Sequence, residues 1–311
     1  MKFTVYQGSR QGPRPYNQDR LAYSYSKDAL MMAIADGMGG HRHGEVAAQL
    51  AIKMLTDAFQ KQATPELSNP NRFLNEQITE IHESIDDIRK NNGLMEAPRT
   101  TLVAAIIQRD MVYIAHVGDS RLYHFRNKEL IYRTQDHSVV QMLLRKGQIK
   151  KEDMLEHPDR HKIYNCLGGD KPPQIELSGK RKMMDGDILL LCTDGLWTAM
   201  TDSEIGQSLH YGTVNVSAAR LLDKAEALGK QDGDNISLLA IQWGDPQNGE
   251  EPVSTGTMPL GATTTIMNPV IHEPTMRLDN GVEAVPDLSE DEMEKAIADI
   301  QAAIHKTTGG K

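Results

Sequence analysis

Cysteine is scarce in this chain of 311 residues, which has only Cys166 and Cys192. Two cysteines are too few for the disulfide framework of a small secreted protein. Cys192 also lies at the end of the apolar run ILLLC, so we expect both residues to be reduced thiols of the core. Long apolar runs are missing too, because stretches such as TLVAAII at 101–107 are far too short to span a bilayer. The opening residues MKFTVYQGSR lack the apolar stretch of a secretion signal, and we therefore expect a cytoplasmic protein without a membrane partner.

Runs of lysine or arginine are absent as well, which argues against a nucleic-acid partner, since such a protein needs a phosphate-neutralising patch. The formal net charge is -9, but residues 245–311 carry most of it, with 12 acids against 4 bases. Residues 1–244 are therefore nearly neutral. With 39% hydrophobic residues, the chain is long enough to bury a sizeable core.

Short strands followed by long helices are predicted over the first 90 residues. The strands alternate apolar and polar residues, and the turn-rich loop GPRPYN separates the first two. After a cluster of glycines, two stretches carry apolar residues at helical spacing. The predicted strands are 3–8, 19–26 and 30–36, and the predicted helices are 44–61 and 71–90.

From residue 100 onward the pattern returns to strands. Three runs separated by turn residues, at 100–108, 111–119 and 120–127, predict an antiparallel meander. The remaining predictions are a short helix at 138–147, a polar surface excursion at 147–185, a buried strand at 187–195, a helix at 216–229 and a closing strand at 235–243. Antiparallel strands with helix pairs between them favour an α+β layered domain over a parallel sheet.

Beyond Trp243 the composition changes to Gly, Pro, Thr and Asn. Residues 245–286 are too polar to repay the entropy of ordering, so we expect a disordered linker there. Residues 287–311 predict an amphipathic C-terminal helix, in which Ser289 and Glu292 have the spacing of a capping box. Two interpretations of this helix remain open: it packs on the body or frays, or it docks on a partner.

Four aspartates stand at the ends of apolar strands: Asp36, Asp119, Asp194 and Asp234. Each alone would be an ordinary turn residue. Four carboxylates beside a core are costly, however, unless they are hydrogen-bonded or bind a cation. Oxygen ligands without a cysteine or histidine cluster favour Mg²⁺ or Mn²⁺ over zinc. The adjoining glycines would let the backbone approach such a cation closely.

Seven motifs follow one another along residues 1–243. They are RPYNQD at 14–19, ADGMGGHRHGE at 35–45, RTTLVAA at 99–105, VGDSRLY at 117–123, TQDHS at 134–138, LLLCTDGLWT at 189–198 and GDNISLLAI at 233–241. Each is weak alone, but in this order they resemble the metal-dependent protein phosphatases of type 2C, which dephosphorylate phosphoserine and phosphothreonine. The form DGMGGHxxGE resembles the bacterial branch of that family.

The resemblance implies a four-layer αββα sandwich over residues 1–244, in which two central antiparallel sheets are flanked by helix pairs and 147–185 forms a flap. It also implies two catalytic cations, Mn²⁺ or Mg²⁺, and a possible third. Such a pair of cations activates a bridging water for in-line attack on phosphorus. The implied roles are Asp36 bridging two cations, the Gly37 carbonyl on the second, Asp194 and Asp234 on the first, Asp119 with Asp194 on the third, Asp19 acting through water, and Arg14 gripping the phosphate.

Three positions depart from the family pattern. Met38 stands where many eukaryotic members have a histidine proposed as general acid, so that role passes to His41, to the second candidate His43, or to water on a cation. Gln18 replaces a frequent glutamate, which would weaken a water-mediated contact to the second cation. Arg99 replaces a frequent glycine and would alter packing near the cleft.

The resemblance implies phosphorylated proteins as substrates and a bacterial Ser/Thr kinase as the opposing enzyme. A non-catalytic phosphoprotein-binding regulator of the same fold is the main alternative. A metal hydrolase of another class, such as a nuclease or a small-molecule phosphatase, also stays open, although the lack of a basic track disfavours a nuclease. We expect a monomer, because the core is large and no surplus apolar stripe lies outside the tail.

Overall fold

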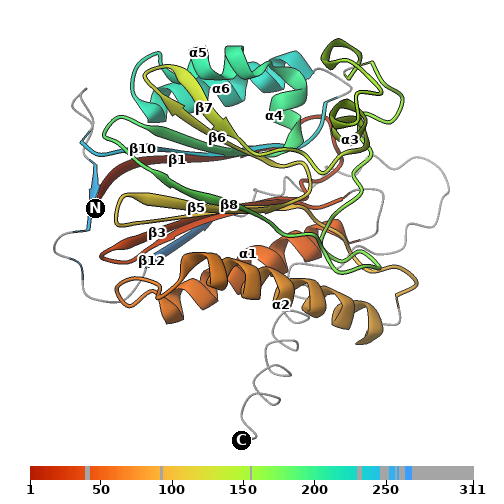
Figure 1. Ribbon diagram of the computed structural model, residues 1–311, viewed down its shortest axis with the longest axis horizontal. Coiled ribbons are helices and arrows are strands. Elements are labelled where there is room, and N and C mark those ends of the chain that lie inside the picture. Colours follow the sequence, from red (N-terminus) through yellow and green to blue (C-terminus); the bar gives the residue numbers. More distant parts are fainter. Residues whose placement is uncertain are drawn as a thin grey trace, which may run out of the picture.

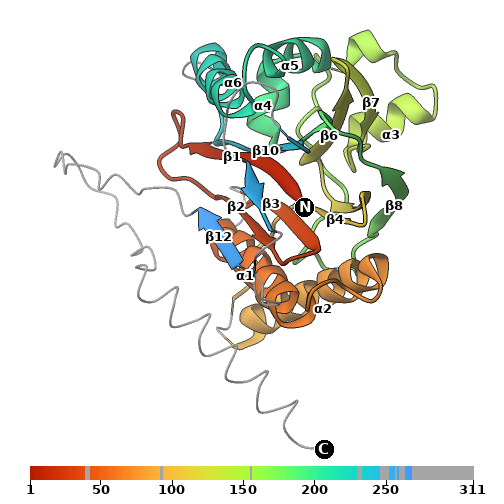
Figure 2. The ribbon, with the colours of Figure 1, turned by 90° about the vertical axis from the view of Figure 1, so that its left-hand side faces the viewer.

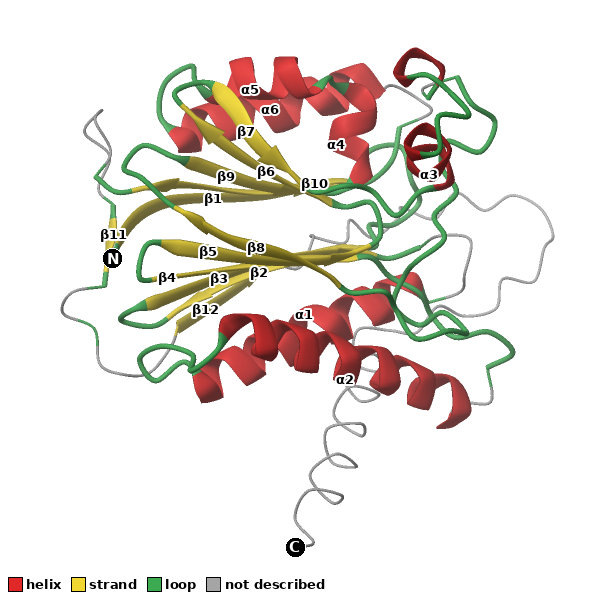
Figure 3. Cartoon of the chain, viewed as in Figure 1, coloured by secondary structure: helices red, strands yellow, loops and turns green. Residues whose placement is uncertain are grey.

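The computed structural model describes residues 1–38, 43–91, 94–154, 156–229, 233–245, 252–255, 258 and 263–267. Two six-stranded sheets lie face to face, and helices cover the outer face of each sheet (Figure 1). Figure 2 shows the same layers from the side, and Figure 3 separates helices from strands by colour. The predicted four-layer αββα sandwich is confirmed.

The first sheet contains the N-terminal strand, two strands that precede the flap and three strands that follow it. Its members are β1 (Lys2–Arg10), β6 (Arg121–Arg126), β7 (Glu129–Arg133), β9 (Ile188–Cys192), β10 (Ile236–Trp243) and β11 (Val253–Ser254). They lie in the order β11-β1-β10-β9-β6-β7, and all neighbouring strands pair antiparallel. All five residues of β9 are buried, as expected for a central strand covered on both faces.

The second sheet is also antiparallel, in the order β12-β2-β3-β4-β5-β8. Its strands are β2 (Asp19–Tyr25), β3 (Ala29–Asp36), β4 (Leu102–Gln108), β5 (Met111–Val117), β8 (Glu176–Lys182) and β12 (Thr263–Met267). The strand β4 is buried along its whole length. Apolar side chains from both sheets meet between them, including Ile34, Val103, Leu191 and Leu239.

Two helix layers complete the sandwich. Helices α1 (Gly44–Gln62) and α2 (Pro70–Asn91) pack on the second sheet through apolar stripes that include Leu50, Leu55, Ile78 and Ile81. Helices α4 (Asp194–Ala199), α5 (Asp202–Leu209) and α6 (Val214–Gly229) pack on the first sheet. The short helix α3 (Val139–Arg145) is capped by Ser138, whose hydroxyl accepts a hydrogen bond from the Gln141 N–H.

The predicted meander is wrong in its third strand. Strands β4 and β5 pair, but β6 pairs with β7 and β9 in the other sheet. The chain therefore crosses between the sheets at Gly118–Ser120, where Gly118 has a φ of 105°. A β-carbon there would also lie 2.6 Å from Thr101 Cγ2. Period-two patterning marks strands but does not say which sheet they join, and the glycine marks the crossing.

The surface excursion and the tail also need correction. The range 147–185 ends in β8, which pairs with β5, and therefore contributes an edge strand of the second sheet. Within the expected disordered linker 245–286, β11 pairs with β1 and β12 pairs with β2. The predicted C-terminal helix at 287–311 lies outside the described residues. Among the described helices, none combines the length and apolar character that a membrane crossing requires.

Replacing Leu191 by alanine tests the packing between the sheets. This side chain is fully buried in the central cluster, so we expect Leu191→Ala to lower the free energy of unfolding by about 2–5 kcal/mol. Urea denaturation followed by circular dichroism measures the change. Leu130 on the edge strand β7 is 38% exposed and provides the control, because Leu130→Ala should cost less than about 0.5 kcal/mol. Equal losses in both variants would contradict this description of the core.

Candidate metal centre

A cleft of about 850 Å³ opens at one end of the sandwich, where several strands stop. The four aspartates predicted at strand ends all line it, together with Arg14. The fifth predicted acid, Asp19, is fully buried. The sequence-predicted carboxylates therefore converge from segments that are up to 215 residues apart between Asp19 and Asp234.

The first two acids come from neighbouring strands of the second sheet. Asp19 opens β2 and stands opposite Asp36, the last residue of β3. The Asp36 backbone is held on both sides, because its carbonyl accepts hydrogen bonds from Thr101 N–H and Thr100 Oγ1, each at 2.9 Å. The Thr193 hydroxyl donates to Asp19 Oδ2 at 2.9 Å. Both residues are thus held by strands of the sheet rather than by a loop.

Gly37 follows Asp36 and packs tightly against the start of α1. A β-carbon on Gly37 would lie 2.5 Å from the backbone carbonyl group of Gly44, and one on Gly44 would lie 2.7 Å from the Met38 nitrogen. The Gly37 N–H donates to the Gln18 carbonyl at 3.2 Å. These glycines bring two backbone segments together at the cleft, which is the close approach that their residue type predicts.

Asp194 and Asp234 come from the first sheet. Asp194 is the first residue of α4 and follows β9, while Asp234 lies just before β10. The charge of Asp194 is one of the causes that raise the pKa of Asp36, so the acids of the two sheets interact electrostatically. Arg14 donates from Nη2 to Asp234 Oδ2 at 2.8 Å, and half of its side-chain surface remains exposed. Asp119 reaches the same cleft from the crossing between the sheets.

Burial and mutual repulsion both disfavour the charged forms of these carboxylates. Burial, followed by the charges of the other four acids, raises the pKa of Asp36 well above its usual range. Burial is also the main cause that raises the pKa of Asp19 and that of Asp194, each to about 7. The pKa of Asp119 is also raised, first by burial and then by the charges of its acidic neighbours. Each negative charge raises the cost of ionising the next one, and a bound cation would remove that cost.

The donor set fits a hard divalent cation. Asp19 Oδ1 is buried and has no hydrogen-bond partner among the described residues, which is unfavourable for a carboxylate oxygen unless water or a cation satisfies it. The surrounding donors are carboxylates and backbone carbonyls, the ligands that Mg²⁺ and Mn²⁺ prefer. The residues of the cleft therefore suit the cations that the sequence predicted.

A second group with ligand atoms close together lies beside the flap and consists of His116, His137 and Glu176. His137 Nδ1 faces two donors, the Gly118 N–H at 3.2 Å and Asn165 Nδ2 at 2.7 Å. Its proton must therefore sit on Nε2, 3.4 Å from Glu176 Oε2, where a metal would have to bind. This histidine consequently ties the flap to the sheets and is a poor metal ligand.

The positions that depart from the family pattern have different surroundings. Met38 lines the cleft. His41 lies outside the described residues, and His43 precedes α1 with its Nδ1 3.9 Å from Glu45 Oε1. Gln18 donates from Nε2 to Glu45 Oε2 at 3.0 Å. The carbonyl of Arg99 accepts the Met38 N–H at 3.0 Å, so the backbone at position 99 supports the cleft whatever its side chain.

Three residues that the sequence reasoning did not select also belong to the site. Arg160 and His161, from the flap, line the cleft with Arg14. Burial and the two nearby arginines lower the pKa of His161, which favours its neutral form. Asn235 holds the loops together, because its side chain accepts the Gln18 N–H at 2.9 Å and donates to the Tyr16 carbonyl at 3.0 Å. Its place in GDNIS was a usable signal, whereas the flap has no periodic pattern.

Comparisons with known proteins agree with this site. The model of a family described as protein phosphatase 2C matches residues 10–228. The serine/threonine phosphatase stp of Listeria monocytogenes is 34% identical over 242 residues, which cover 76% of this chain and 94% of the relative. The serine/threonine protein phosphatase PstP of Mycobacterium tuberculosis is 33% identical over 236 residues, covering 74% of this chain and 44% of the relative.

Solved structures show the same likeness. A serine/threonine phosphatase of S. agalactiae superposes with a TM-score of 0.71 at 28% identity, over 77% of this chain and 99% of that one. The catalytic domain of PstP in complex with two manganese ions has a TM-score of 0.65 at 30% identity, over 78% and 98% of the two chains. Fold, site and likeness together define a protein-serine/threonine phosphatase. The chain belongs to the protein phosphatase 2C family, in its bacterial branch.

The raised pKa values predict how the metal-free protein responds to pH. The unfolded chain releases the protons of Asp19 and Asp194 near pH 4, whereas the folded chain keeps them until about pH 7. The folded state binds more protons in this window, so these groups make stability fall as pH rises through it.

Thermal denaturation in EDTA at several pH values checks this expectation. Asp194→Asn removes one of the titrating groups, so its stability relative to the wild type should rise between about pH 4 and pH 7. Added Mn²⁺ should restore the wild type near pH 8 and restore the variant less. A constant difference between the two proteins over the whole window would contradict the predicted repulsion.

Proposed function

We propose that this phosphatase removes phosphate from phosphoserine and phosphothreonine in proteins with two catalytic Mn²⁺ or Mg²⁺ ions and a weaker third one. The observation that carries the proposal is the convergence of four aspartates and the partly exposed Arg14 on one cleft, with Asp19 buried as a fifth acid. The pKa values of Asp19, Asp36, Asp119 and Asp194 are raised. Carboxylates that repel one another so strongly are suited to binding cations.

The ligands are assigned from the family resemblance and the positions in the cleft. Asp36, at the centre of the group, would bridge two cations, and the Gly37 carbonyl would serve the second. Asp194 and Asp234 would complete the first site, Asp119 would join Asp194 at the third, and Asp19 would act through water. When bound, such cations supply Lewis-acid activation of water and neutralise phosphate charge.

Arg14 has the position and chemistry to hold the phosphate. Its guanidinium is planar and carries five N–H donors, of which Nη2 contacts Asp234. The half-exposed side chain leaves other donors free to face the cleft, where two parallel hydrogen bonds can grip a phosphoryl group. Arg160 adds positive charge on the flap side of the same cleft. Arg14 and Arg160 would thus contact the negatively charged phosphate of the substrate, while the aspartates would hold the metal ions.

The leaving hydroxyl needs a proton, and His161 is the described histidine that lines the cleft. Its lowered pKa makes it mostly neutral near pH 7, so little of it is in the protonated form that could act as a general acid. The neutral imidazole can still orient the leaving oxygen or relay a proton. His41 remains a candidate on the sequence alone. We further infer that the enzyme acts as a monomer, which its large core supports, and that it opposes a bacterial Ser/Thr kinase, which the family resemblance supports.

Hydrolysis of a phosphothreonine peptide tests these roles. We expect activity to require Mn²⁺ or Mg²⁺, to fall by at least about 100-fold in Asp194→Ala, and to show a raised KM in Arg14→Ala because phosphate binding weakens. Arg10→Ala is the matched control, since Arg10 pairs with Asp223 and Glu226 on the surface, and it should leave both constants unchanged.

A different result would favour the alternative function. If the wild type binds the phosphopeptide without hydrolysing it in the presence of metal, the protein is a phosphoprotein-binding regulator. If it prefers a small phosphate ester over every phosphopeptide, the proposed protein substrate is wrong, but the proposed metal centre is not contradicted.

A further inference from the structure

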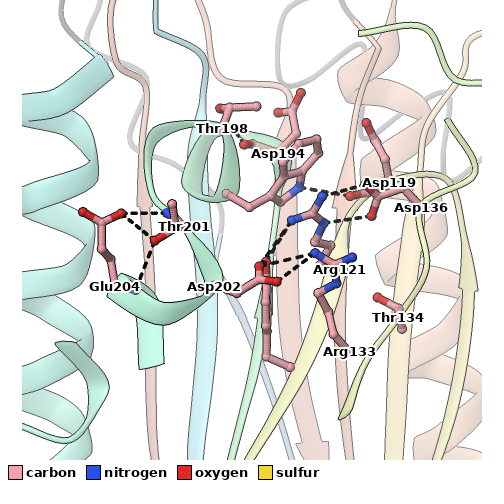
Figure 4. Close-up of polar contacts among 12 residues, drawn as sticks. Asp119, Arg121, Arg133, Thr134, Asp136, Asp194, Thr198, Thr201, Asp202 and Glu204 are labelled. Carbon is pink, nitrogen blue, oxygen red and sulfur yellow. Dashed lines mark hydrogen bonds and ion pairs between the residues drawn. The ribbon is translucent and has the colours of Figure 1, made fainter. Parts of the chain in front are cut away.

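A buried arginine lies directly behind the predicted metal ligands. Arg121 opens β6, two residues after Asp119, and only 6% of its surface is exposed. Its guanidinium grips Asp136 with two parallel hydrogen bonds, Nε to Oδ1 at 2.8 Å and Nη2 to Oδ2 at 2.6 Å. Figure 4 shows this pair between Asp119 and the start of α5. Both ends of the pair are withdrawn from water, so its geometry is fixed.

Further contacts hold the guanidinium from its other edge. Nη1 donates to the Tyr123 hydroxyl at 3.1 Å and lies 3.7 Å from Asp202 Oδ1. Asp202 is held in turn by Arg133 at 3.0 Å (Figure 4). The plane of the Arg121 group is therefore set by partners on β6, on α5 and in the segment before α3.

The face of this fixed plane carries the indole of Trp197. The Arg121 carbon Cζ lies 3.7 Å from the centre of the Trp197 ring, a cation–π contact. The indole nitrogen donates to the Asp119 backbone carbonyl at 3.0 Å. Trp197 thus bridges the arginine and the backbone of a predicted metal ligand.

The same tryptophan belongs to α4, which begins with Asp194. This helix has six residues, too few to fix the direction of its first side chain by its own hydrogen bonds. Asp119 lies on a crossing between sheets that has no regular structure. Trp197 is three residues beyond Asp194, so the stacked indole connects the helix that carries one acid to the crossing that carries the other.

We propose that Arg121, clamped by Asp136, is a positioning residue that sets Asp119 and Asp194 for their shared cation through the indole of Trp197. The inference rests on the metal centre proposed above. Partners behind a first layer of ligands change metal affinity by about 10–100-fold when removed. Lysine cannot replace the arginine, because it lacks the planar group on which the indole stacks and the two parallel donors.

Calorimetric titration of the full-length protein with Mn²⁺ tests the proposal. Asp119→Asn first identifies the weaker binding event, which this variant should lose. Arg121→Lys and Trp197→Phe should each weaken that event by about tenfold or more. The tighter events should weaken much less, because Asp194 is the only one of their ligands that the indole positions. Trp197→Phe keeps an aromatic ring but loses the N–H donor, so it also serves if Arg121→Lys does not fold.

Arg126→Lys is the matched control. Arg126 lies at the opposite end of β6 and donates two hydrogen bonds to Asp187, of 2.7 and 2.8 Å. The variant therefore loses the same kind of arginine–carboxylate pair, but far from the cleft. A separate readout uses Trp197 fluorescence in a Trp243→Phe background. Acrylamide should quench Trp197 more strongly once Arg121→Lys removes the stacking partner.

The possible outcomes are distinct. Weakening of the Asp119-dependent event in Arg121→Lys and Trp197→Phe, but not in Arg126→Lys, supports the proposal. Unchanged affinity in Trp197→Phe overturns it, and so does an equal loss in the control, because a loss of general stability then explains the effect. If the wild type binds no Mn²⁺ at all, the metal centre itself is wrong and the positioning role falls with it.

Discussion

The cost of holding several carboxylates close together in a buried site is the constraint that the rest of this structure must satisfy. Asp36 stands at the centre of the group, and burial and four acidic neighbours together raise its pKa. Charges of one sign can be held this close together only by a rigid framework. Two sheets packed face to face and covered on both outer faces provide that framework, because a close-packed interior transmits strain instead of absorbing it.

The framework reaches the cleft through backbone contacts more than through side chains. The Asp36 carbonyl is tied to the segment at Thr100–Thr101, and Gly37 packs against Gly44 without room for a β-carbon. The first tie joins residues that are 64 positions apart in the chain, and the second closes the short segment between β3 and α1. We therefore expect the acids to keep their relative positions when a cation binds, so that binding does not have to assemble the site.

Much of this arrangement could be read from the sequence, and the failures have physical causes. The periodicity of 44–61 and 71–90 predicted α1 and α2, and acids at strand ends predicted the cleft, because burial demands a partner for each carboxylate. Patterning could not assign β6 to its sheet, since both faces of both sheets are covered. It also missed β11 and β12, whose edge pairing is specified by backbone hydrogen bonds. The flap residues Arg160 and His161 were missed because a loop has no period.

The order of the strands has a consequence for the protein as it is being made. β1 opens the chain but pairs along its length with β10, and its other edge meets β11 near residue 253. The contacts that close the first sheet thus have a very large sequence separation, and such contacts form late in folding. The site is divided in the same way, with Asp19 and Asp36 emerging first and Asp234 last. A ribosome-bound fragment that ends before Asp234 contains neither a complete first sheet nor a complete set of metal ligands. We therefore expect phosphatase activity only after nearly the whole domain has been synthesised.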